Sequence, residues 1–331
     1  MEKKGALTLL FCVLSVLGLM LYSGQACAAD YPTKPINIWV SYAPGGSLDT
    51  VTRTICPIAA KILGQPIIVE NKAGGGGTVA LALLANAKPD GYTLASATDS
   101  AIVRQPQFQK VTYKPLKSFT PLIAYAAVQN GIVVRKDAPW NSLKELIAYA
   151  KANPGKVKYG TGGVGTGMHH AVVVLERQGN IKMIHVPYKG NADALTALMG
   201  GHLDFASAGP ELYPFVRSGS LKLLAMTENK RHPSYPNVPT MTELGYEFSN
   251  DAFFTIVAPA GLPADIAKKV EDAFQKAAES KEVKAVLGTL ELRPVLFVGK
   301  AYADRLNSYW NRMEKSLKET GLIKEPATSP Y

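Results

Sequence analysis

Three glycine-rich loops are the parts of this chain best suited to chemistry. They cover residues 43–46, 74–77 and 160–165, and each follows a strand-like segment and precedes a helix-like one. The first N–H groups of a helix have no partners inside the helix and carry a partial positive charge. Glycine lets a ligand approach such groups closely, so these loops favour an anion such as a carboxylate. Asp49, which follows the first loop, either accepts hydrogen bonds inside that loop or caps the next helix.

The motifs of enzymes are incomplete in this sequence. Residues 160–165 match the dinucleotide-binding spacing G-x-G-x-x-G, but the acidic residue expected about twenty positions later is missing from residues 181–185. His169 and His170 are adjacent and cannot share one helix face. Neither an H-E-x-x-H zinc motif nor a G-x-S-x-G nucleophile motif occurs. We therefore expect no catalytic activity, no metal and no cofactor.

Composition excludes several other classes of protein. The chain has 331 residues, of which 47% are hydrophobic and 19% charged, and this favours two folded domains over a disordered chain. The 36 Lys and Arg residues outnumber the 26 Asp and Glu residues and give a net charge of +10. The basic residues are scattered, with no run of five, so we expect no nucleic-acid partner. The diffuse positive field would attract anions.

The amino terminus has the pattern of a secretory signal peptide. Lys3 and Lys4 precede a largely apolar run over residues 6–22, and small residues follow at positions 26–29. We expect residues 1–29 to be removed by cleavage near Ala28 or Ala29, which places the protein in the periplasm. The alternative is a lipoprotein anchored on Cys27. Gly24 and Gln25 fit that alternative poorly, because a lipoprotein signal prefers an aliphatic residue and a small residue at those positions.

Cleavage at this place leaves Cys56 as the only cysteine. An internal disulfide and a thiol-based metal cluster are then both impossible, so a large hydrophobic core must stabilise the protein. A lone cysteine inside a helical pattern is typically a small buried hydrophobic residue. We expect a monomer.

The segments around the loops alternate between strand-like and helix-like patterns. Strands are expected near residues 36–42, 67–70, 92–95, 131–135, 156–159, 182–186, 203–206 and 221–225, with helices between most of them. This alternation predicts an α/β fold with mainly parallel sheets. A last apolar stretch at 253–258 precedes helical segments that start at Pro263, Lys281 and Lys300.

The apolar stretch at 253–258 also suggests how the chain divides. A strand there would rejoin the first sheet after the chain has built a second one. We therefore predict a discontinuous first domain of residues 30–128 and 249–331, a second domain of residues 129–248, and two hinge crossovers between them. Gln129 and Asn130 fall near the first crossover, where they bind a ligand or satisfy backbone groups.

A series of short motifs carries a resemblance to a known family. They are Tyr31-Pro32-x-Lys34-Pro35-Ile36, Tyr42-Ala43-Pro44-Gly45-Gly46-x-x-Asp49, Leu63-Gly64-Gln65-Pro66, Val69-Glu70-Asn71-Lys72-x-Gly74, Pro89-Asp90-Gly91-Tyr92-Thr93-Leu94, the 160–171 loop with His169, Pro187-Tyr188-Lys189-Gly190, Gly200-Gly201-x-x-Asp204, Pro239-Thr240-Met241-x-Glu243-x-Gly245 and Ala258-Pro259-Ala260-Gly261-x-Pro263. Together they resemble the extracytoplasmic solute receptors of tripartite tricarboxylate transporters, the Bug family. The motifs span essentially all of the expected mature chain.

The resemblance implies a fold, a function and a set of ligand residues. The fold would be a two-domain periplasmic binding protein, a type II-like Venus flytrap, that binds a small organic acid between its domains and delivers it to the membrane permease. Backbone N–H groups of Gly45, Gly46 and Ser47 would hold a carboxylate from the first domain, and Thr161, Gly163 and Thr166 would act from the second. The full set of expected ligand residues is Tyr42, Ala43, Gly45, Gly46, Ser47, Asp49, Thr98, Gln129, Thr161, Gly163, Thr166, His169, Tyr188, Gly190 and Asp204.

The sequence departs from the family pattern at two positions. Tyr42 stands where the first loop usually carries Phe, and Asp99 stands where an uncharged residue is more usual. Asp99 would repel an anion, contact an amino group of a ligand, or face solvent. Two other functions stay open at this stage: an exported hydrolase on the same scaffold, and a receptor that serves a signalling partner.

Overall fold

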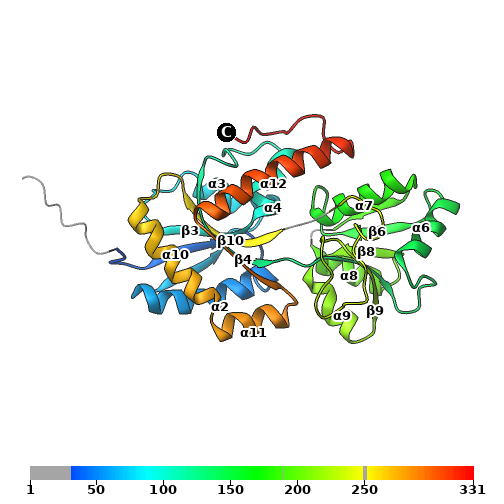
Figure 1. Ribbon diagram of the computed structural model, residues 1–331, viewed down its shortest axis with the longest axis horizontal. Coiled ribbons are helices and arrows are strands. Elements are labelled where there is room, and N and C mark those ends of the chain that lie inside the picture. Colours follow the sequence, from blue (N-terminus) through cyan, green and yellow to red (C-terminus); the bar gives the residue numbers. More distant parts are fainter. Residues whose placement is uncertain (1–30, 189, 249–251) are drawn as a thin grey trace, which may run out of the picture. The chain divides into compact units, whose positions relative to one another are not determined.

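The computed structural model of the protein describes residues 31–188, 190–248 and 252–331, and Figure 1 shows its two β-sheets with their covering helices. The chain divides into a unit of residues 1–33 and a unit of residues 34–331, and both sheets lie in the second unit. The predicted signal peptide over residues 1–29 lies outside the described residues, as does Lys189.

The first sheet has six strands in the order β11-β4-β10-β3-β1-β2. The strands are β1 (Ile36–Val40), β2 (Ile67–Asn71), β3 (Thr93–Thr98), β4 (Phe119–Ala127), β10 (Phe253–Pro259) and β11 (Arg293–Val298). Its helices are α2 (Ser47–Leu63), α3 (Thr78–Leu84), α4 (Asp99–Val103), α5 (Gln105–Phe108), α10 (Ala264–Ala278), α11 (Lys281–Thr289) and α12 (Lys300–Glu319), with a 3₁₀ turn η1 at Gly75–Gly77. Figure 1 shows α3, α4 and α12 on one side of this sheet and α2 and α11 on the other.

The apolar periodicity of the sequence explains these elements. Ile36, Ile38 and Val40 are buried and alternate with half-buried residues along β1, which is the period of two that a strand requires. Val51, Ile55 and Ala59 recur every four residues along α2 and are fully buried. Cys56 is buried beside them, as predicted for a small core residue, and burial raises the pKa of its thiol to about 12.

The second sheet has five strands in the order β7-β6-β8-β5-β9. The strands are β5 (Gly131–Arg135), β6 (Lys158–Thr161), β7 (Ile184–Pro187), β8 (Phe205–Ala208) and β9 (Leu221–Met226). The helices are α6 (Leu143–Ala152), α7 (Gly167–Gly179), α8 (Asn191–Met199) and α9 (Tyr213–Arg217), with a 3₁₀ turn η2 at Pro210–Leu212. Along β5, Ile132 and Val134 join the core under α6 and α7, whereas Val133 joins the core under α8. The sheet is therefore covered on both faces.

Both sheets are mixed, which corrects the prediction of mainly parallel sheets. β1 pairs in parallel with β2 and β3, and β6 pairs in parallel with β7 and β8. However, β10 runs antiparallel to β3 and β4, and β5 runs antiparallel to β8 and β9. The reason is that the chain crosses between the sheets at the carboxyl ends of the parallel strands. β5 and β10 each start there and must run back in the opposite direction. The carboxyl ends of the parallel strands therefore lie on the crossover side of each sheet.

The chain passes twice between the sheets. β4 is followed by β5 after three residues, and β9 is followed by β10, which lies between β4 and β3 in the first sheet. The apolar stretch at 253–258 therefore forms the strand that rejoins the first sheet. The domain boundaries after residues 128 and 248 stay a prediction.

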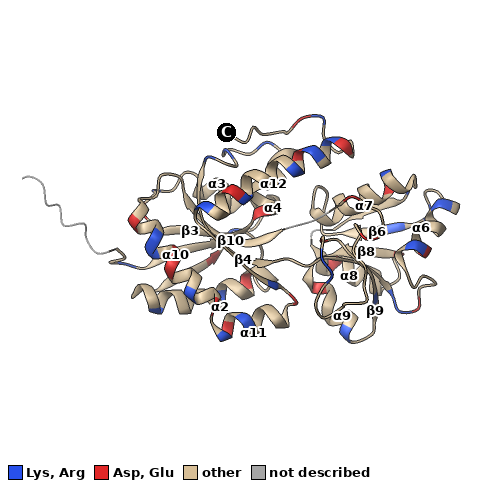
Figure 2. Cartoon of the chain, viewed as in Figure 1, with Lys and Arg blue, Asp and Glu red and all other residues tan. Residues whose placement is uncertain are grey.

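Charged side chains on the surface helices are mixed in sign. Figure 2 shows Lys and Arg interspersed with Asp and Glu along α10 and α12. Several of these residues form ion pairs four positions apart, among them Lys268 with Asp272 and Lys318 with Glu314. Such pairs are weak, and they indicate a solvated helix face rather than a patch of one charge.

Candidate functional site

The first glycine loop leads directly into α2, which covers the side of the first sheet opposite α12. Gly46 is the N-cap residue of α2, with an extended backbone (φ −74°) and no side-chain cap. The N–H groups of the first turn of a helix find no acceptor inside the helix, so they are the natural donors for an outside anion. A Cβ on Gly46 would meet only the Ala43 carbonyl oxygen, at 3.6 Å. A small side chain at Gly46 would therefore meet no close neighbour.

Asp49 fixes the shape of this loop. Its side chain is 5% exposed. One carboxylate oxygen accepts the Gly45 N–H at 2.9 Å, and the other accepts Asn71 Nδ2 at 2.8 Å and Arg53 Nε at 3.0 Å. Burial alone would raise the pKa of Asp49, but the hydrogen bonds from Gly45, Asn71 and Arg53 outweigh burial and the pKa is lowered. Of the two alternatives for Asp49, the structure shows the hydrogen bonds inside the loop.

This arrangement corrects the role expected for Gly45. Its N–H group donates to Asp49 rather than pointing to a ligand. Gly45 has φ +80°, a left-handed conformation that glycine adopts without strain. Gly45 therefore helps to position the loop, and the donors left for a ligand are those of Gly46 and Ser47.

Tyr42 joins this loop to its neighbours. Its hydroxyl donates to the Gly76 carbonyl oxygen at 3.0 Å and lies 3.2 Å from Thr98 Oγ1. Thr98 in turn accepts the Ala101 N–H at 3.2 Å at the start of α4. Burial raises the pKa of the Tyr42 hydroxyl. The hydroxyl that distinguishes Tyr42 from the usual Phe is thus used to hold the glycine loops together, while Ala43 beside it is exposed.

The glycine loop at residues 160–165 follows β6 and opens α7. Thr161 is fully buried, and its hydroxyl donates to the Gly163 carbonyl oxygen at 3.2 Å and lies 2.8 Å from His185 Nε2. Thr166 is the N-cap of α7: it accepts the His169 N–H at 3.3 Å and donates to the Gly163 carbonyl oxygen at 2.8 Å. These side chains therefore order the loop from inside.

Two histidines stack beneath this loop. The rings of His169 and His185 lie 4.3 Å apart, and His169 Nδ1 accepts the Gly165 N–H at 3.3 Å. Burial, together with His185 and Arg104, lowers the pKa of His169 to about 4, so the ring is neutral at pH 7. His169 therefore supports the loop as a neutral hydrogen-bond acceptor.

The loop between β7 and α8 lies at the same end of the second sheet as the 160–165 loop. The Tyr188 N–H donates to the Thr161 carbonyl oxygen at 3.0 Å, which extends the pairing of β7 and β6 by one residue. Gly190 is the N-cap of α8, again without a side-chain cap. Tyr188 and Gly190 thus lie beside the Thr161–Thr166 loop, together with which they were expected to bind the ligand.

A contact joins the loops of the two sheets. Ser47 Oγ donates to Glu211 Oε1 at 3.3 Å, and Asn191 Nδ2 donates to Glu211 Oε2 at 3.0 Å. Glu211 lies in η2, directly after β8, and Asn191 opens α8. Sequence reasoning missed both residues, although each follows a strand at the same edge as the glycine loops. That position was the signal that could have identified them.

The crossover segments carry a buried carboxyl group that was also missed. Glu228 Oε1 accepts the Asn130 N–H at 3.0 Å, Asn130 Nδ2 at 2.8 Å and the Thr227 hydroxyl at 3.2 Å. Glu228 Oε2 is buried and has no hydrogen-bond partner. Burial raises the pKa of Glu228 to about 8. Gln129, expected to contact a ligand, is buried beside Asn130 in this segment.

This carboxyl group leads to a prediction about pH. A pKa raised from 4.5 to about 8 means that the folded protein binds the proton more tightly than the unfolded chain. Glu228 therefore contributes stability below about pH 4.5, and the contribution is lost as pH rises towards 8. We expect Glu228→Gln to gain stability relative to the wild type over this range, on the order of 2–4 kcal/mol at pH 8.5. Urea unfolding at several pH values measures the difference.

The control is Glu282→Gln on α11, an exposed position with no part in the crossover. Its difference from the wild type should not change with pH over the same range. Equal pH profiles for Glu228→Gln and the wild type would show that Glu228 ionises normally in the folded protein.

Asp204 and Asp99 both use their carboxylates to hold other parts of the fold. Asp204 accepts the Lys158 N–H at 2.7 Å at the amino end of β6, whereas the loops follow its carboxyl end. The expectation that Asp204 contacts the ligand is therefore corrected: it caps the backbone of a strand.

Asp99 is fully buried, accepts the Phe253 N–H at 2.7 Å and pairs with Arg305 at 3.2 Å. Asp99 therefore holds α4, β10 and α12 together, which is none of the roles considered for it.

Comparison with known proteins decides the family. Residues 51–322 match the model of the tripartite tricarboxylate transporter family receptor. The chain belongs to this receptor family. A relative, the UPF0065 protein in the gbd 5'region of Cupriavidus necator, is 36% identical over 310 residues, which cover 94% of each chain. The family resemblance found in the sequence motifs is confirmed.

Solved structures agree with the fold. The structure of the periplasmic binding protein BugD is 29% identical, with a TM-score of 0.79, and the match covers 88% of this chain and 99% of that one. A protein of R. palustris solved with adipate is 27% identical, with a TM-score of 0.81, and the match covers 88% and 98%. The protein is thus a two-domain α/β periplasmic binding protein, and it is a solute receptor of the tripartite tricarboxylate transporter family.

Other features of the receptor can be read from the residues that the structure describes. Within residues 31–188, 190–248 and 252–331, no helix has both the length and the apolar character to span a bilayer. In the same ranges no three His, Cys, Asp or Glu side chains form a cluster able to hold a metal ion. The members of this family are solute receptors rather than enzymes.

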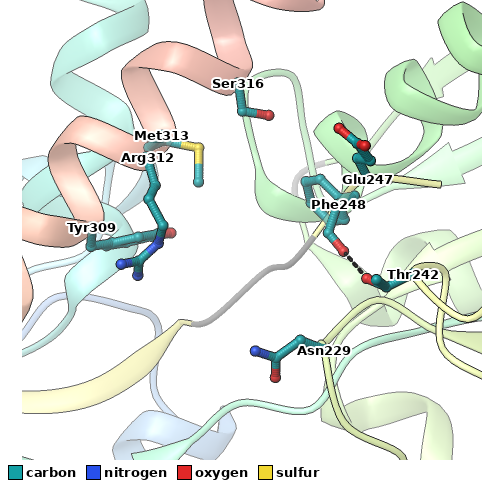
Figure 3. A pocket seen from close by; sticks show the side chains of 8 residues that line it. All are labelled: Asn229, Thr242, Glu247, Phe248, Tyr309, Arg312, Met313 and Ser316. Atoms are coloured by element: carbon teal, nitrogen blue, oxygen red, sulfur yellow. Dashed lines mark hydrogen bonds between the residues drawn. The ribbon is translucent and has the colours of Figure 1, made fainter.

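A separate cavity of about 350 Å³ lies between α12 and the segment after β9 (Figure 3). Its walls are Tyr309, Arg312, Met313 and Ser316 on one side and Asn229, Thr242, Glu247 and Phe248 on the other. In Figure 3 the Arg312 and Tyr309 side chains lie together on the α12 side. None of the residues expected to bind ligand lines this cavity, and it contains no helix N-terminus. The receptor's ligand site is better sought at the glycine loops.

Proposed function

We propose that this receptor binds a small organic carboxylate at the glycine loops, between its two domains, and delivers it to the permease of a tripartite tricarboxylate transporter. The observation that carries the proposal is the uncapped start of α2 at Gly46 and Ser47, held ready by Asp49. An anion there would meet N–H donors that have no acceptor within the helix. The adipate in the R. palustris relative supports a carboxylate ligand.

The remaining ligand residues follow from the same geometry. In this proposal the amides of Gly46 and Ser47 hold one carboxylate. Backbone groups of the Thr161–Thr166 loop and the Tyr188–Gly190 loop contact the rest of the ligand. Tyr42, Thr98 and His169 act by ordering these loops through the hydrogen bonds described above. Ala43 is exposed beside the loop and Gln129 is buried at the crossover.

An exported hydrolase on this scaffold is the main alternative. Thr161 and His185 lie within hydrogen-bond distance, as a nucleophile and its base would. However, Thr161 is fully buried and its hydroxyl also donates to the Gly163 carbonyl oxygen. A nucleophile must reach its substrate, so we propose that the protein is not an enzyme.

The proposal is tested by thermal unfolding with a panel of dicarboxylates, tricarboxylates, aromatic acids and acidic amino acids. A ligand at about 100 times its dissociation constant stabilises the folded protein by roughly 2.7 kcal/mol. We expect at least one acid to raise the melting temperature accordingly. A response only to neutral sugars or to amines without a carboxylate would contradict the proposal. The intact mass of the exported protein is a separate measurement. It distinguishes a chain that begins near Asp30 from one that carries lipid on Cys27.

A further inference from the structure

Glu291 joins the two sheets through contacts that involve none of the glycine loops. It lies between α11 and β11, on the side of the first sheet. One carboxylate oxygen accepts Arg217 Nη1 at 2.7 Å, and the other accepts the Ser234 hydroxyl at 3.0 Å. The Glu291 carbonyl oxygen lies 3.2 Å from His232 Nε2. We call these three interactions the Glu291 contact.

The partners of Glu291 are fixed to the second sheet. Arg217 is the last residue of α9, which precedes β9, and His232 and Ser234 follow β9. The Ser234 N–H donates to His232 Nδ1 at 3.0 Å, so Nε2 carries the ring proton and donates to the Glu291 carbonyl oxygen. The centroid of the His232 ring lies 5.0 Å from that of Tyr213, which is buried in the core under α8. The two sides of the Glu291 contact therefore belong to different sheets.

The backbone of Glu291 has a conformation that suits glycine better than glutamate. Its φ is +53°, and it directly follows Leu290, the C-cap residue of α11. The Glu291 N–H donates to the Gly288 carbonyl oxygen at 3.1 Å, and the Leu292 N–H donates to the Leu287 carbonyl oxygen at 2.8 Å. This is the Schellman pattern, in which glycine is the usual residue at the position of Glu291. The side-chain contacts with the second sheet give a reason for glutamate here.

The Glu291 contact occurs in an arrangement in which loops of the two sheets also meet. In the same structure, Ser47 Oγ at the start of α2 donates to Glu211 Oε1 in η2 at 3.3 Å. A ligand that binds between the domains needs such an arrangement. Any contact that forms only in this arrangement therefore adds its free energy to ligand binding. The Glu291 side chain is 11% exposed, so solvent screens its charge less than that of a surface residue.

We infer that Glu291 is a positioning residue that holds the two sheets together around the carboxylate. This inference rests on the proposed function, because it requires a ligand between the domains. The contacts of Glu291 are with Arg217, His232 and Ser234, none of which is expected to bind the ligand. Glu291 acts on affinity by raising the population of the arrangement in which the loops of both sheets meet.

The test is Glu291→Gly, which removes the side chain at a position where the helix end favours glycine. We expect this variant to fold for that reason. Calorimetry with adipate, malate, succinate and citrate should show that the acid bound most tightly by the wild type is bound roughly fivefold more weakly. Without acid, small-angle X-ray scattering should give a larger radius of gyration than for the wild type. A saturating concentration of that acid should restore the wild-type radius.

Asn180→Gly is the matched control. Asn180 is exposed, has φ +48° and is the C-cap residue of α7, so the change introduces glycine at a comparable helix end. Its affinity and radius of gyration should equal those of the wild type. Arg217→Gln removes the partner charge and should weaken binding as Glu291→Gly does. The double variant should lose less affinity than the product of the two single losses, because both changes remove the same ion pair.

Circular dichroism and melting temperature establish that the variants are folded. Equal affinities and equal radii of gyration for Glu291→Gly and the wild type would overturn the inference while leaving the carboxylate receptor intact. The same loss of affinity in Asn180→Gly would assign the effect to the added glycine and would also overturn it. Absence of binding by every acid in this set and in the broader panel would contradict the proposed function itself, and the inference with it.

Discussion

Replacement of Gly46 by valine is expected to lower ligand affinity on the order of 100-fold while the protein stays folded. Gly46 has φ −74°, which valine adopts without strain, and a Cβ there meets only the Ala43 carbonyl oxygen at 3.6 Å. The branched side chain would instead fill the space in front of the α2 amides. Loss of one or two charge-assisted hydrogen bonds costs about 2–4 kcal/mol. Calorimetry with the acid identified in the panel measures the effect.

Folding must be measured beside binding for this variant. Valine is a poor N-cap residue compared with glycine, so we expect the free energy of unfolding to fall by no more than about 1 kcal/mol. Gly288→Ala on α11 is the matched control, because a Cβ there has open space and no ligand is expected nearby. A folded Gly46→Val protein with wild-type affinity would move the ligand away from the start of α2.

Asp49→Asn is expected to weaken ligand binding by roughly 5- to 30-fold. The substitution keeps the shape of the side chain but removes the charge that accepts hydrogen bonds from Gly45, Arg53 and Asn71. Charge-assisted hydrogen bonds are about twice as strong as neutral ones, and their weakening costs on the order of 1–2 kcal/mol. The loop would then sample conformations in which the Gly46 and Ser47 amides no longer converge. Titration calorimetry compares the variant with the wild type.

Asp304→Asn on α12 provides the control for loss of a negative charge. Asp304 is exposed and pairs with Lys300, four residues earlier. The affinity of this variant should equal that of the wild type, because exposed ion pairs contribute little and this one is far from the loops. Equal affinities for Asp49→Asn and Asp304→Asn would mean that Asp49 stabilises the loop without affecting the ligand.

The local pattern of the sequence predicted many elements but not the pairing of the strands. The period of two in residues 36–40 and the four-residue spacing from Val51 give β1 and α2 directly. β4 and β11 were not predicted, because β4 is buried along most of its length and lacks a clear alternation, and β11 follows helices without a glycine loop. The antiparallel entry of β5 and β10 depends on where the chain crosses between sheets, which no local pattern records.

The sequence motifs located the glycine loops, but they did not separate ligand-facing groups from supporting ones. Gly45, Thr161 and His169 lie in the expected loops, yet each uses its hydrogen-bonding groups to hold a loop in place. Asp204 belongs to a family motif and still lies at the wrong end of β6. A motif marks residues that occur together in a site. Residues that support the backbone of a loop give the same motif as residues that contact the ligand.

By itself, the sequence determined the α/β class, the family and the loops that open onto the carboxyl ends of the parallel strands, because each depends on residues close together along the chain. Only the tertiary structure showed that Glu211 meets Ser47 and that Glu228 binds Asn130. These pairs are 164 and 98 residues apart. The balance of buried donors and acceptors is a sum over all neighbours in space, so it exists only once the two sheets have folded and the chain has crossed between them.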